Sequence, residues 1–359
     1  MLKVVHVVEA LAGGVHTYFK DLSWFFDSEQ TQTGINTTII YSANRKEVDP
    51  KQIKETFSKS VSLIEINMMR EFSLLEDYSA LIRLIKTLRA IQPDVVHLHS
   101  SKAGVLGRIA CLLLSKKVKV FYTPHGYAFL RTDITAIRKK TYRAIEVLFQ
   151  KISRNTTIAC GDTEFEIAKK IGPSLLVRNG ITINEVQKYS IAHNNSTLTI
   201  GIVGRITAAR NPELFNTIAL QNPQFNFVWI GDGELKSALS ATNISVTGWF
   251  LNQKEVLQEL NKIDVYIQTS LWEGLPIAVL EAMAMQKPVV ATNIVGNKDI
   301  VVPNETGFLF DTILEVNEYL AILQDENTRA VLGKNGLARC QKLFSNDRKF
   351  NELVAIYQG

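Results

Sequence analysis

Short apolar runs alternate with longer segments of helical period along most of the chain. The first run ends in a Gly-Gly turn and is followed by an amphipathic segment through Tyr18, Leu22 and Phe25. This alternation predicts buried strands of a parallel sheet covered by helices on both faces. In the first half we expect strands at Val4–Val8, Thr37–Tyr41, Val61–Ile66, Val95–His99, Val118–Thr123 and Thr156–Cys160.

The alternation breaks between residues 178 and 198 and then resumes. The break holds Asn179-Gly180 and the polar run HNNST at 193–197, which favour a linker. A second set of strands is expected at Leu198–Val203, Phe225–Ile230, Ile244–Thr247, Val265–Gln268 and Pro288–Ala291.

We therefore predict an α/β protein with two Rossmann-like parallel-sheet lobes and a cleft between them. The 359 residues suit two such domains. The expected divisions are a first domain at 1–180, a linker at 181–198, a second domain at 199–345, and a last helix at 346–359 that packs back on the first domain.

The composition changes this picture little. Apolar residues make up 46% and charged residues 21%, a globular balance. The longest apolar runs are far shorter than the ~20 residues that cross a bilayer, and the N-terminus lacks the features of a signal peptide. Three widely spaced cysteines give no disulfide framework and no zinc pattern. These features predict a cytoplasmic protein.

The net charge of +5 hides an asymmetry between the two halves. Residues 1–190 hold 27 Lys and Arg against 18 Asp and Glu, whereas residues 191–359 hold 13 against 17. The halves thus differ by +9 against −4, and a basic lobe favours an anionic partner such as a membrane surface, a lipid phosphate or nucleic acid.

The segment at 270–292 carries the most chemistry. A strand ends at a loop with Glu273, Gly274 and Leu275, and Pro276 suits the first position of the helix that follows. The positive end of that helix is an anion site for a diphosphate or a polar sugar, and glycine lets a ligand approach the backbone. Glu281 lies among apolar residues of the helix, so we expect it to bind a ribose diol while Glu273 faces the sugar.

A second segment, at 201–215, ends a strand at Gly204 and adds Arg205 and Arg210. Two guanidinium groups near strand ends can neutralise a leaving diphosphate. Asn211 is expected to cap the next helix. The segment is neither G-x-G-x-x-G nor a P-loop. The loops at 231–235 and 246–250 are expected to rim the same nucleotide site, on weaker signals.

The first lobe offers two further loops at strand ends. The amides of Gly13 and Gly14 could approach the diphosphate, and the tight Pro-His-Gly turn favours His125 as a functional histidine. His99 occupies a similar strand end, whereas His97 is expected to point into the sheet.

With these motifs, the chain resembles retaining glycosyltransferases of the GT-B fold, specifically glycosyltransferase family 4. The likeness spans nearly the whole chain and rests on the Gly-Gly loop, the Pro-His-Gly loop, Asn179-Gly180, Gly204-Arg205 and E-x7-E from Glu273 to Glu281. Members often carry Lys at the position of Arg210, and often Ser within the segment that reads Gly-Asp-Thr-Glu at 161–164.

The resemblance implies transfer of a sugar from a nucleotide diphosphate sugar to an acceptor hydroxyl. Arg205 and residue 210 would hold the diphosphate, and Glu281 the ribose. Glu273 with the amides of Gly274, Leu275 and Pro276 would contact the sugar, with His125 near it. No cofactor and no metal are expected, since the sequence lacks Asp-x-Asp and its two arginines can stabilise the leaving group.

Residues 129–154 give the only indication of the kind of acceptor. Apolar residues there recur at helical spacing, at 130, 134, 137, 145, 148 and 152, and residues 131–154 hold seven Lys and Arg against two acids. The favoured interpretation is a helix that packs on the sheet with a solvated basic face. The alternative is a basic amphipathic surface on the inner face of the cell membrane, which would suit a polyprenyl-diphosphate-linked acceptor in surface polysaccharide assembly.

Three other function classes remain open. A nucleotide-sugar epimerase of the same architecture would need acid and base carboxylates in both lobes. A non-catalytic nucleotide-sugar-binding module would not need Glu273 or Arg205. Nucleic-acid binding ranks last, because the chain shows no recognised binding motif.

Overall fold

A computed structural model describes residues 1–9, 11–28, 33–44, 48–69, 73–192, 195–250 and 252–359. The chain divides into two compact units. The first comprises residues 1–130, 134–178 and 347–359, and the second comprises residues 131–133 and 179–346. Part of the HNNST run, 193–194, lies outside the described residues.

The first unit is built on a parallel sheet of seven strands in the order β3-β2-β1-β4-β5-β6-β7. Its strands are β1 (Leu2–Val8), β2 (Ile35–Tyr41), β3 (Ser62–Glu65), β4 (Val95–His99), β5 (Lys119–Thr123), β6 (Thr156–Ala159) and β7 (Ser174–Leu176). Its helices are α1 (Gly14–Ser28), α3 (Pro50–Thr56), α4 (Leu74–Ile91), α5 (Ser101–Leu112), α6 (Ala136–Ser153), α7 (Asp162–Lys169) and, from residue 347 on, α15 (Asn346–Gln358).

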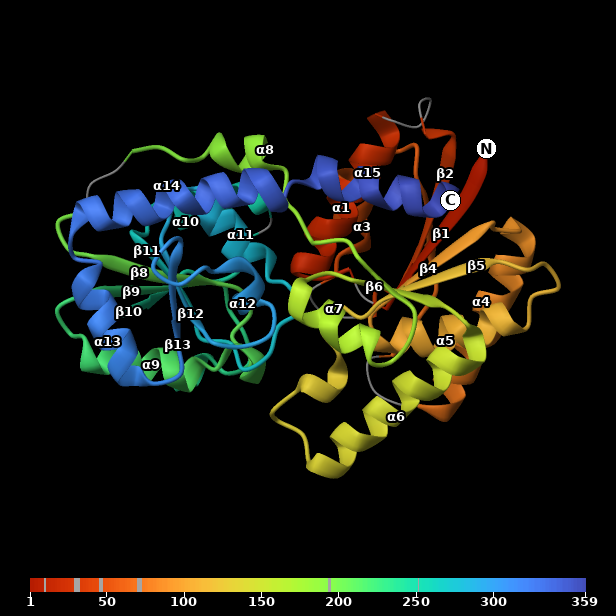
Figure 1. Ribbon diagram of the computed structural model, residues 1–359, viewed down its shortest axis with the longest axis horizontal. Helices are drawn as coiled ribbons and strands as arrows, with labels where there is room; N and C mark the ends of the chain where they lie inside the picture. Colours follow the sequence, from red (N-terminus) through yellow and green to blue (C-terminus); the bar gives the residue numbers. More distant parts are fainter. Residues whose placement is uncertain (10, 29–32, 45–47, 70–72, 193–194, 251) are drawn as a thin grey trace. The chain divides into compact units, whose positions relative to one another are not determined.

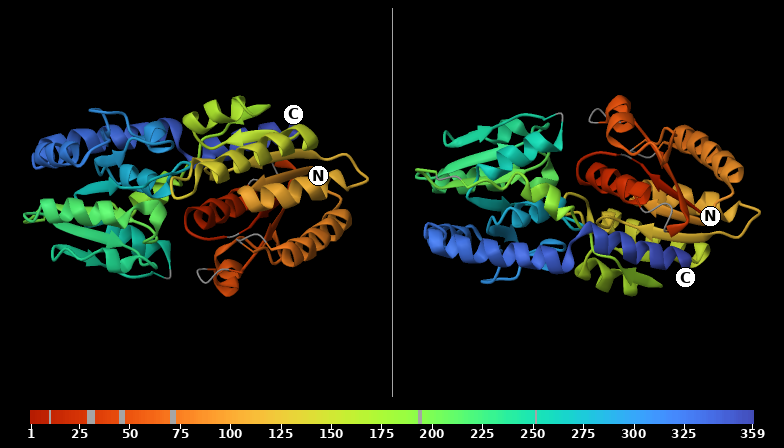
Figure 2. Two further views of the ribbon diagram at one scale, coloured as in Figure 1. Left: turned by 90° about the horizontal axis from the view of Figure 1, so that it is seen from below. Right: turned by 90° about the horizontal axis from the view of Figure 1, so that it is seen from above.

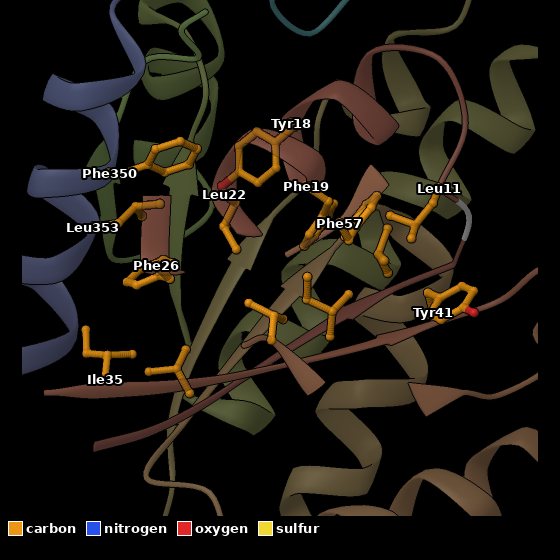
Figure 3. Packing of buried hydrophobic residues seen from close by; sticks show 14 of the residues in the cluster. Leu11, Tyr18, Phe19, Leu22, Phe26, Ile35, Tyr41, Phe57, Phe350 and Leu353 are labelled. Carbon is orange, nitrogen blue, oxygen red and sulfur yellow. The ribbon is translucent and has the colours of Figure 1, made fainter. Parts of the chain in front are cut away.

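Helices cover both faces of this sheet, as the alternation of apolar runs predicts (Figure 1). One apolar core joins the sheet to α1, α3 and α15, where Phe19, Phe350 and Leu353 pack together (Figure 3). The other joins it to α4, α5 and α7. Figure 2 gives two further views of α15. In the last turn of this helix, Gln358 Nε2 donates a hydrogen bond to the carbonyl of Thr33 at 2.8 Å.

The second unit holds a parallel sheet of six strands in the order β10-β9-β8-β11-β12-β13. Its strands are β8 (Thr199–Val203), β9 (Asn226–Ile230), β10 (Ile244–Val246), β11 (Val265–Gln268), β12 (Val289–Thr292) and β13 (Gly307–Phe310). Its helices are α8 (Ile183–Gln187), α9 (Pro212–Gln221), α10 (Gln253–Asn261), α11 (Ile277–Ala284), α12 (Asn297–Ile300), α13 (Ile313–Ile322) and α14 (Glu326–Leu343).

The two Rossmann-like sheets and all the expected strands are confirmed, whereas β7 and β13 were not predicted from the sequence. Both are short edge strands; β7 follows Pro173 and β13 begins at Gly307, so neither offers a long apolar run. The segment predicted as a linker contains α8.

Most of the basic residues of α6 are exposed, as the favoured interpretation of residues 129–154 expects, but the apolar residues at helical spacing are not the side of the helix that packs inward. The helix buries the polar Glu146 and Gln150, whereas Ile137, Leu148 and Ile152 are 77%, 52% and 48% exposed. Glu146 accepts hydrogen bonds from Arg108 Nη2 at 2.8 Å and Tyr122 Oη at 2.9 Å. Because a buried charge needs its partner, this ion pair sets the rotation of the helix.

Candidate functional site

In each sheet the strand order reverses once, between β1 and β4 in the first unit and between β8 and β11 in the second. Parallel α/β sheets bind ligands at the carboxyl ends of the strands beside such a reversal. The residues expected from the sequence follow these strands in both units. Each unit therefore presents one candidate set of side chains, and we describe the two sets separately.

In the second unit, β8 ends at Gly204 and the chain turns back across it. Gly204 has a φ of +139°, and a Cβ at this position would lie 2.8 Å from Arg210 Nε. Glycine therefore lets the Arg210 guanidinium lie directly against the backbone. Arg205, the next residue, is partly buried. Asn211 caps α9 by accepting a hydrogen bond from the amide of Leu214, as predicted.

The loop that follows β11 places Glu273 opposite this arginine. Arg210 Nη1 lies 3.4 Å from Glu273 Oε1, and both side chains are about one-fifth exposed (21% and 18%). The same carboxylate oxygen accepts hydrogen bonds from Gln268 Nε2 and Ser270 Oγ, each at 2.8 Å. Glu273 is thus held beside the Arg210 guanidinium by three polar contacts, and both side chains keep some exposure to solvent.

Hydrogen bonds between the loops support this pair. Thr269 Oγ1 donates to the Arg210 carbonyl at 2.6 Å, and the amide of Leu271 donates to the Ala209 carbonyl at 2.8 Å. The loop after β9 packs against the loop that follows β8, so closely that a Cβ on Gly231 would lie 2.3 Å from the Gly204 carbonyl oxygen. The Gly-Asp-Gly segment thus packs on the loop that carries the arginines.

Helix α11 starts immediately after this loop. Gly274, Leu275 and Pro276 are buried. Pro276 is the N-cap and the helix begins at Ile277, one residue later than predicted, because the ψ of Pro276 is extended at 116°. The side-chain amide of Asn179 donates to the Leu275 carbonyl at 3.4 Å.

Glu281 is 5% exposed and accepts a hydrogen bond from Gln253 Nε2 at 2.5 Å. The sequence predicted a ribose diol as the partner of Glu281 and did not identify Gln253. No local signal marks that glutamine, because it opens a helix 28 residues earlier.

In the first unit, Gly13 and Gly14 are exposed at the start of α1. Gly13 has a φ of +55°, and its carbonyl accepts from the amides of His16 and Thr17. The left-handed conformation explains the glycine, which adopts it without strain.

His125 sits in a tight turn after β5, at a φ of +52°. The buried carboxylate of Glu164 holds this turn by accepting from the amides of Gly126 at 2.7 Å and Cys160 at 2.8 Å. Burial raises the pKa of Glu164, and the two amide hydrogen bonds oppose that shift. The role of Glu164 was not predicted from the sequence, although the residue stands in the Gly-Asp-Thr-Glu segment at 161–164.

His125 ends a chain of three imidazoles. Its Nε2 lies 3.0 Å from His99 Nδ1, and His99 Nε2 lies 3.1 Å from His6 Nδ1. Burial lowers the pKa of His6 and of His125 to about 3 and holds that of His99 well below its usual value. The chain is therefore neutral at pH 7, and each ring has one donor and one acceptor nitrogen.

His97 points into the sheet, as predicted. It is fully buried and hydrogen-bonds Tyr357 Oη at 2.6 Å and Thr123 Oγ1 at 2.8 Å. The ring nitrogens of His6, His97 and His99 lie within 4.8 Å of one another, a spacing that a metal ion could use. Both nitrogens of His97 already have partners, however, so the geometry fits a hydrogen-bonded cluster better than a ligand set.

Comparisons with known proteins match both units. Residues 184–339 match the model "Glycosyl transferases group 1", and residues 28–159 match "Glycosyl transferase 4-like". The chain is 29% identical over 326 residues to an Escherichia coli UDP-Gal:alpha-D-GlcNAc-diphosphoundecaprenol alpha-1,3-galactosyltransferase, with 81% of each chain covered. It is 24% identical to the Staphylococcus aureus capsular polysaccharide biosynthesis glycosyltransferase CapM, covering 86% of this chain and 87% of the relative.

Solved structures share the fold at low identity. A sucrose-phosphate synthase from Thermosynechococcus elongatus aligns with a TM-score of 0.81 at 16% identity, covering all of this chain and 98% of the other. Anabaena HepE in complex with UDP and glucose aligns with a TM-score of 0.77, also at 16% identity, over 100% of both chains.

Proposed function

The chain belongs to the glycosyl transferases group 1 and is a GT-B-fold glycosyltransferase, and from that premise we propose that it transfers a sugar, with retention and without a metal, from a nucleotide diphosphate sugar to a lipid-linked saccharide. The Arg210–Glu273 pair carries the proposal. It sets a cation for the diphosphate beside a carboxylate for the sugar hydroxyls, at the strand ends where such sheets bind ligands.

Charge stabilisation is the chemistry that these residues can supply. As the bond to the sugar breaks, negative charge grows on the diphosphate, and we assign the guanidinium groups of Arg205 and Arg210 to stabilise it. Two positive groups and the amino end of α11 together can replace a divalent cation in this role. Glu281, held by Gln253, is assigned the ribose hydroxyls.

The sugar contacts follow from the same loop. We assign Glu273 and the backbone of Gly274, Leu275 and Pro276 to the transferred sugar. His125 is assigned to the sugar as well, and Gly13 and Gly14 to the diphosphate, as the family resemblance implies.

Thermal unfolding with UDP, GDP, dTDP and ADP in EDTA tests the donor site. A nucleotide at 100 times its dissociation constant adds about 2.7 kcal/mol to stability. We expect a shift with one nucleotide, UDP first because the names of two similar proteins include it. Glu281→Ala should lose the shift, and Glu259→Ala, in the exposed pair with Lys262, should keep it. No shift with any nucleotide would contradict the proposal.

A transfer assay tests the reaction itself. Incubation with the nucleotide sugar and a short polyprenyl-diphosphate-linked saccharide should give a product whose anomeric configuration, read by NMR, equals that of the donor. An inverted product would overturn retention, and activity lost in EDTA and restored by Mg²⁺ would overturn metal independence.

We also propose that α6 rests on an anionic membrane surface, which would bring the enzyme to a lipid-linked acceptor. Its exposed apolar residues, Ile137, Leu148 and Ile152, recur at spacings of 11 and 4 and so share one face of the helix. Exposed Lys140 and Lys151 flank that face. A basic amphipathic surface of this kind binds anionic lipid. Among the described residues, no helix is both long and apolar enough to cross a bilayer.

Liposome flotation tests this surface. The protein should float with vesicles that contain anionic lipid at low salt and stay below with neutral vesicles. Ile137→Ser with Leu148→Ser should reduce flotation, whereas Leu220→Ser, which changes a leucine 58% exposed in the second unit, should not. Equal flotation of the double variant and the wild type would show that α6 does not contact the membrane.

A further inference from the structure

A hollow of about 840 Å³ lies at the amino ends of β5 and β6, at the strand ends opposite to those that carry His99 and His125. Residues 114–121 and 152–154 form most of its lining, and we call it the basic hollow. All of its lining belongs to the first unit. The hollow therefore shares no residue with the site assigned to the sugar donor.

Three cations around the basic hollow have no charged partner. Lys117, Lys119 and Arg154 line it and are exposed, and none of their side chains forms a hydrogen bond or an ion pair with the part of the chain that the structure describes. A basic residue at the end of a helix offsets the helix dipole, which accounts for Arg154 as the C-cap of α6. Lys117 and Lys119 follow α5 by several residues, so the dipole gives no reason for them.

The negative groups close to the basic hollow already have partners. Asp94 pairs with Lys116 at 2.7 Å and Glu146 with Arg108 at 2.8 Å, and both of these cations line the hollow as well. Among the described lining residues there is no Asp or Glu, and a terminal carboxylate on Gly359 would still leave an excess of positive charge. A concave surface with charges of one sign concentrates ions of the opposite sign. The basic hollow is therefore suited to an anion.

Apolar side chains at its border indicate which anion. Ile152 lines the basic hollow, is about half-exposed, and also belongs to the exposed apolar face of α6. Leu112 lines it too, and Leu112 and Leu113 are both about half-exposed. A lipid headgroup at a membrane surface offers a phosphate to the cations and an apolar layer to these side chains. A free anion or a nucleic acid satisfies only the cations.

We propose that the basic hollow binds the anionic headgroup of a membrane phospholipid, with Lys117, Lys119 and Arg154 around the phosphate. The inference rests on the proposal that this face of the first unit meets a membrane. In that contact α6 supplies apolar anchorage, and the hollow selects an anionic lipid. Headgroup binding requires no sugar transfer, because the donor residues are elsewhere.

Calorimetric titration with dihexanoyl-phosphatidylglycerol, below its micelle concentration, tests the headgroup site without a membrane. Binding should saturate, weaken at high salt, and fall about 30-fold in Lys117→Gln with Lys119→Gln, because each basic residue contributes roughly fivefold near an anionic lipid. Lys54→Gln with Lys59→Gln removes the same charge from exposed lysines of the first unit outside the hollow and should bind as the wild type does. Equal affinity in the two double variants would overturn the proposal.

Other probes distinguish the source of the phosphate. Dihexanoyl-phosphatidylcholine should bind at least tenfold more weakly than the phosphatidylglycerol, because its headgroup carries no net charge. Inorganic phosphate and a short single-stranded oligonucleotide should not compete with the lipid at equal concentration. Competition by inorganic phosphate would make the hollow a general anion site, and competition by the oligonucleotide would make it a nucleic-acid surface. Either result would overturn the proposal.

Vesicle flotation separates the basic hollow from α6. Lys117→Gln with Lys119→Gln should float less with phosphatidylglycerol vesicles at low salt, while its Tm and its nucleotide-induced thermal shift equal those of the wild type. Loss of flotation in this variant but not in Ile137→Ser with Leu148→Ser would support the hollow and contradict the role of α6. Flotation of the lysine variant equal to that of the wild type would overturn the hollow. A protein that binds the lipid but transfers no sugar would contradict only the proposed reaction.

Discussion

The two units treat charge at their strand ends in opposite ways. In the second unit, Arg210 and Glu273 form an ion pair that remains about one-fifth exposed. In the first unit, the groups at the corresponding sheet edge are neutral imidazoles, and His6 and His99 are fully buried. The five described histidines, at 6, 16, 97, 99 and 125, all lie in the first unit.

This difference separates two kinds of site. Partly exposed charges stay accessible to an ionic ligand and contribute little to the stability of the fold. Buried imidazoles resist protonation, and their fixed hydrogen bonds hold each ring in one orientation. The second unit therefore keeps its charged pair partly accessible to solvent, whereas the first holds its imidazoles neutral and buried.

The largest expected effect concerns the buried ion pair of the first unit. Glu146→Ala leaves Arg108 buried with no carboxylate beside it, which should cost about 3–5 kcal/mol of unfolding free energy. Hydrogen exchange read by mass spectrometry should show faster exchange in α5 and α6. Glu259→Ala, in an exposed pair of the second unit, should cost less than about 1 kcal/mol. Equal losses of unfolding free energy in Glu146→Ala and Glu259→Ala would contradict the contrast between the units.

The next effect concerns the exposed charges of the second unit. Arg205→Ala should lower kcat by roughly 100-fold, since it removes one donor to the leaving diphosphate, with little change in Tm. Steady-state transfer kinetics measure it, and Lys262→Ala, which removes an exposed charge from the same unit, serves as the control. Wild-type turnover in Arg205→Ala would show that this arginine does not stabilise the leaving group.

Acid should unfold the first unit before the second. The folded pKa of His6 is about 3, and those of His97 and His99 are well below the usual value, so the unfolded state binds more protons below pH 6.5. Stability therefore falls as the pH drops from 6.5 toward 4, by about 1.4 kcal/mol per pH unit for each buried histidine. Hydrogen exchange at stepped pH would measure it, and simultaneous loss of both units would contradict it.

The smallest effect tests how Glu281 is held. Gln253→Ala removes the hydrogen bond to its carboxylate, which should cost about 1 kcal/mol of nucleotide binding, or roughly fivefold in Kd. Calorimetric titration with the nucleotide that shifts the Tm measures this, with Lys254→Ala as the neighbouring control. A Kd equal to that of the wild type would mean that Glu281 needs no support.

The same contrast explains what the sequence could predict. The residues of the second unit stand in short motifs at strand ends, so Gly204, Arg210 and Glu273 could be named from local pattern. Their pairing could not, because Glu273 lies 63 residues beyond Arg210 and the loops meet only in the folded sheet.

In the first unit, the local sequence pattern singles out His125 but not the residues that surround it in the fold. His6 lies in the middle of a strand and looks like any other buried position, and Lys349 looks like an ordinary lysine of an amphipathic helix. His6 joins the imidazole chain, and Lys349 comes to lie over the Tyr18 ring, only through tertiary packing. The orientation of α6 was missed for a related reason, because its buried side is set by the Glu146–Arg108 ion pair rather than by its apolar residues.

The place of α15 in the chain has a consequence for synthesis. Its residues Phe350, Leu353 and Tyr357 belong to the core that includes β1 and α1, some 330 residues earlier in the sequence. On the ribosome, the second unit has all of its residues once 346 has emerged, whereas the first unit must wait for 347–359. The unit that is made first is therefore completed last, and until then its apolar face stays open to chaperones or to aggregation.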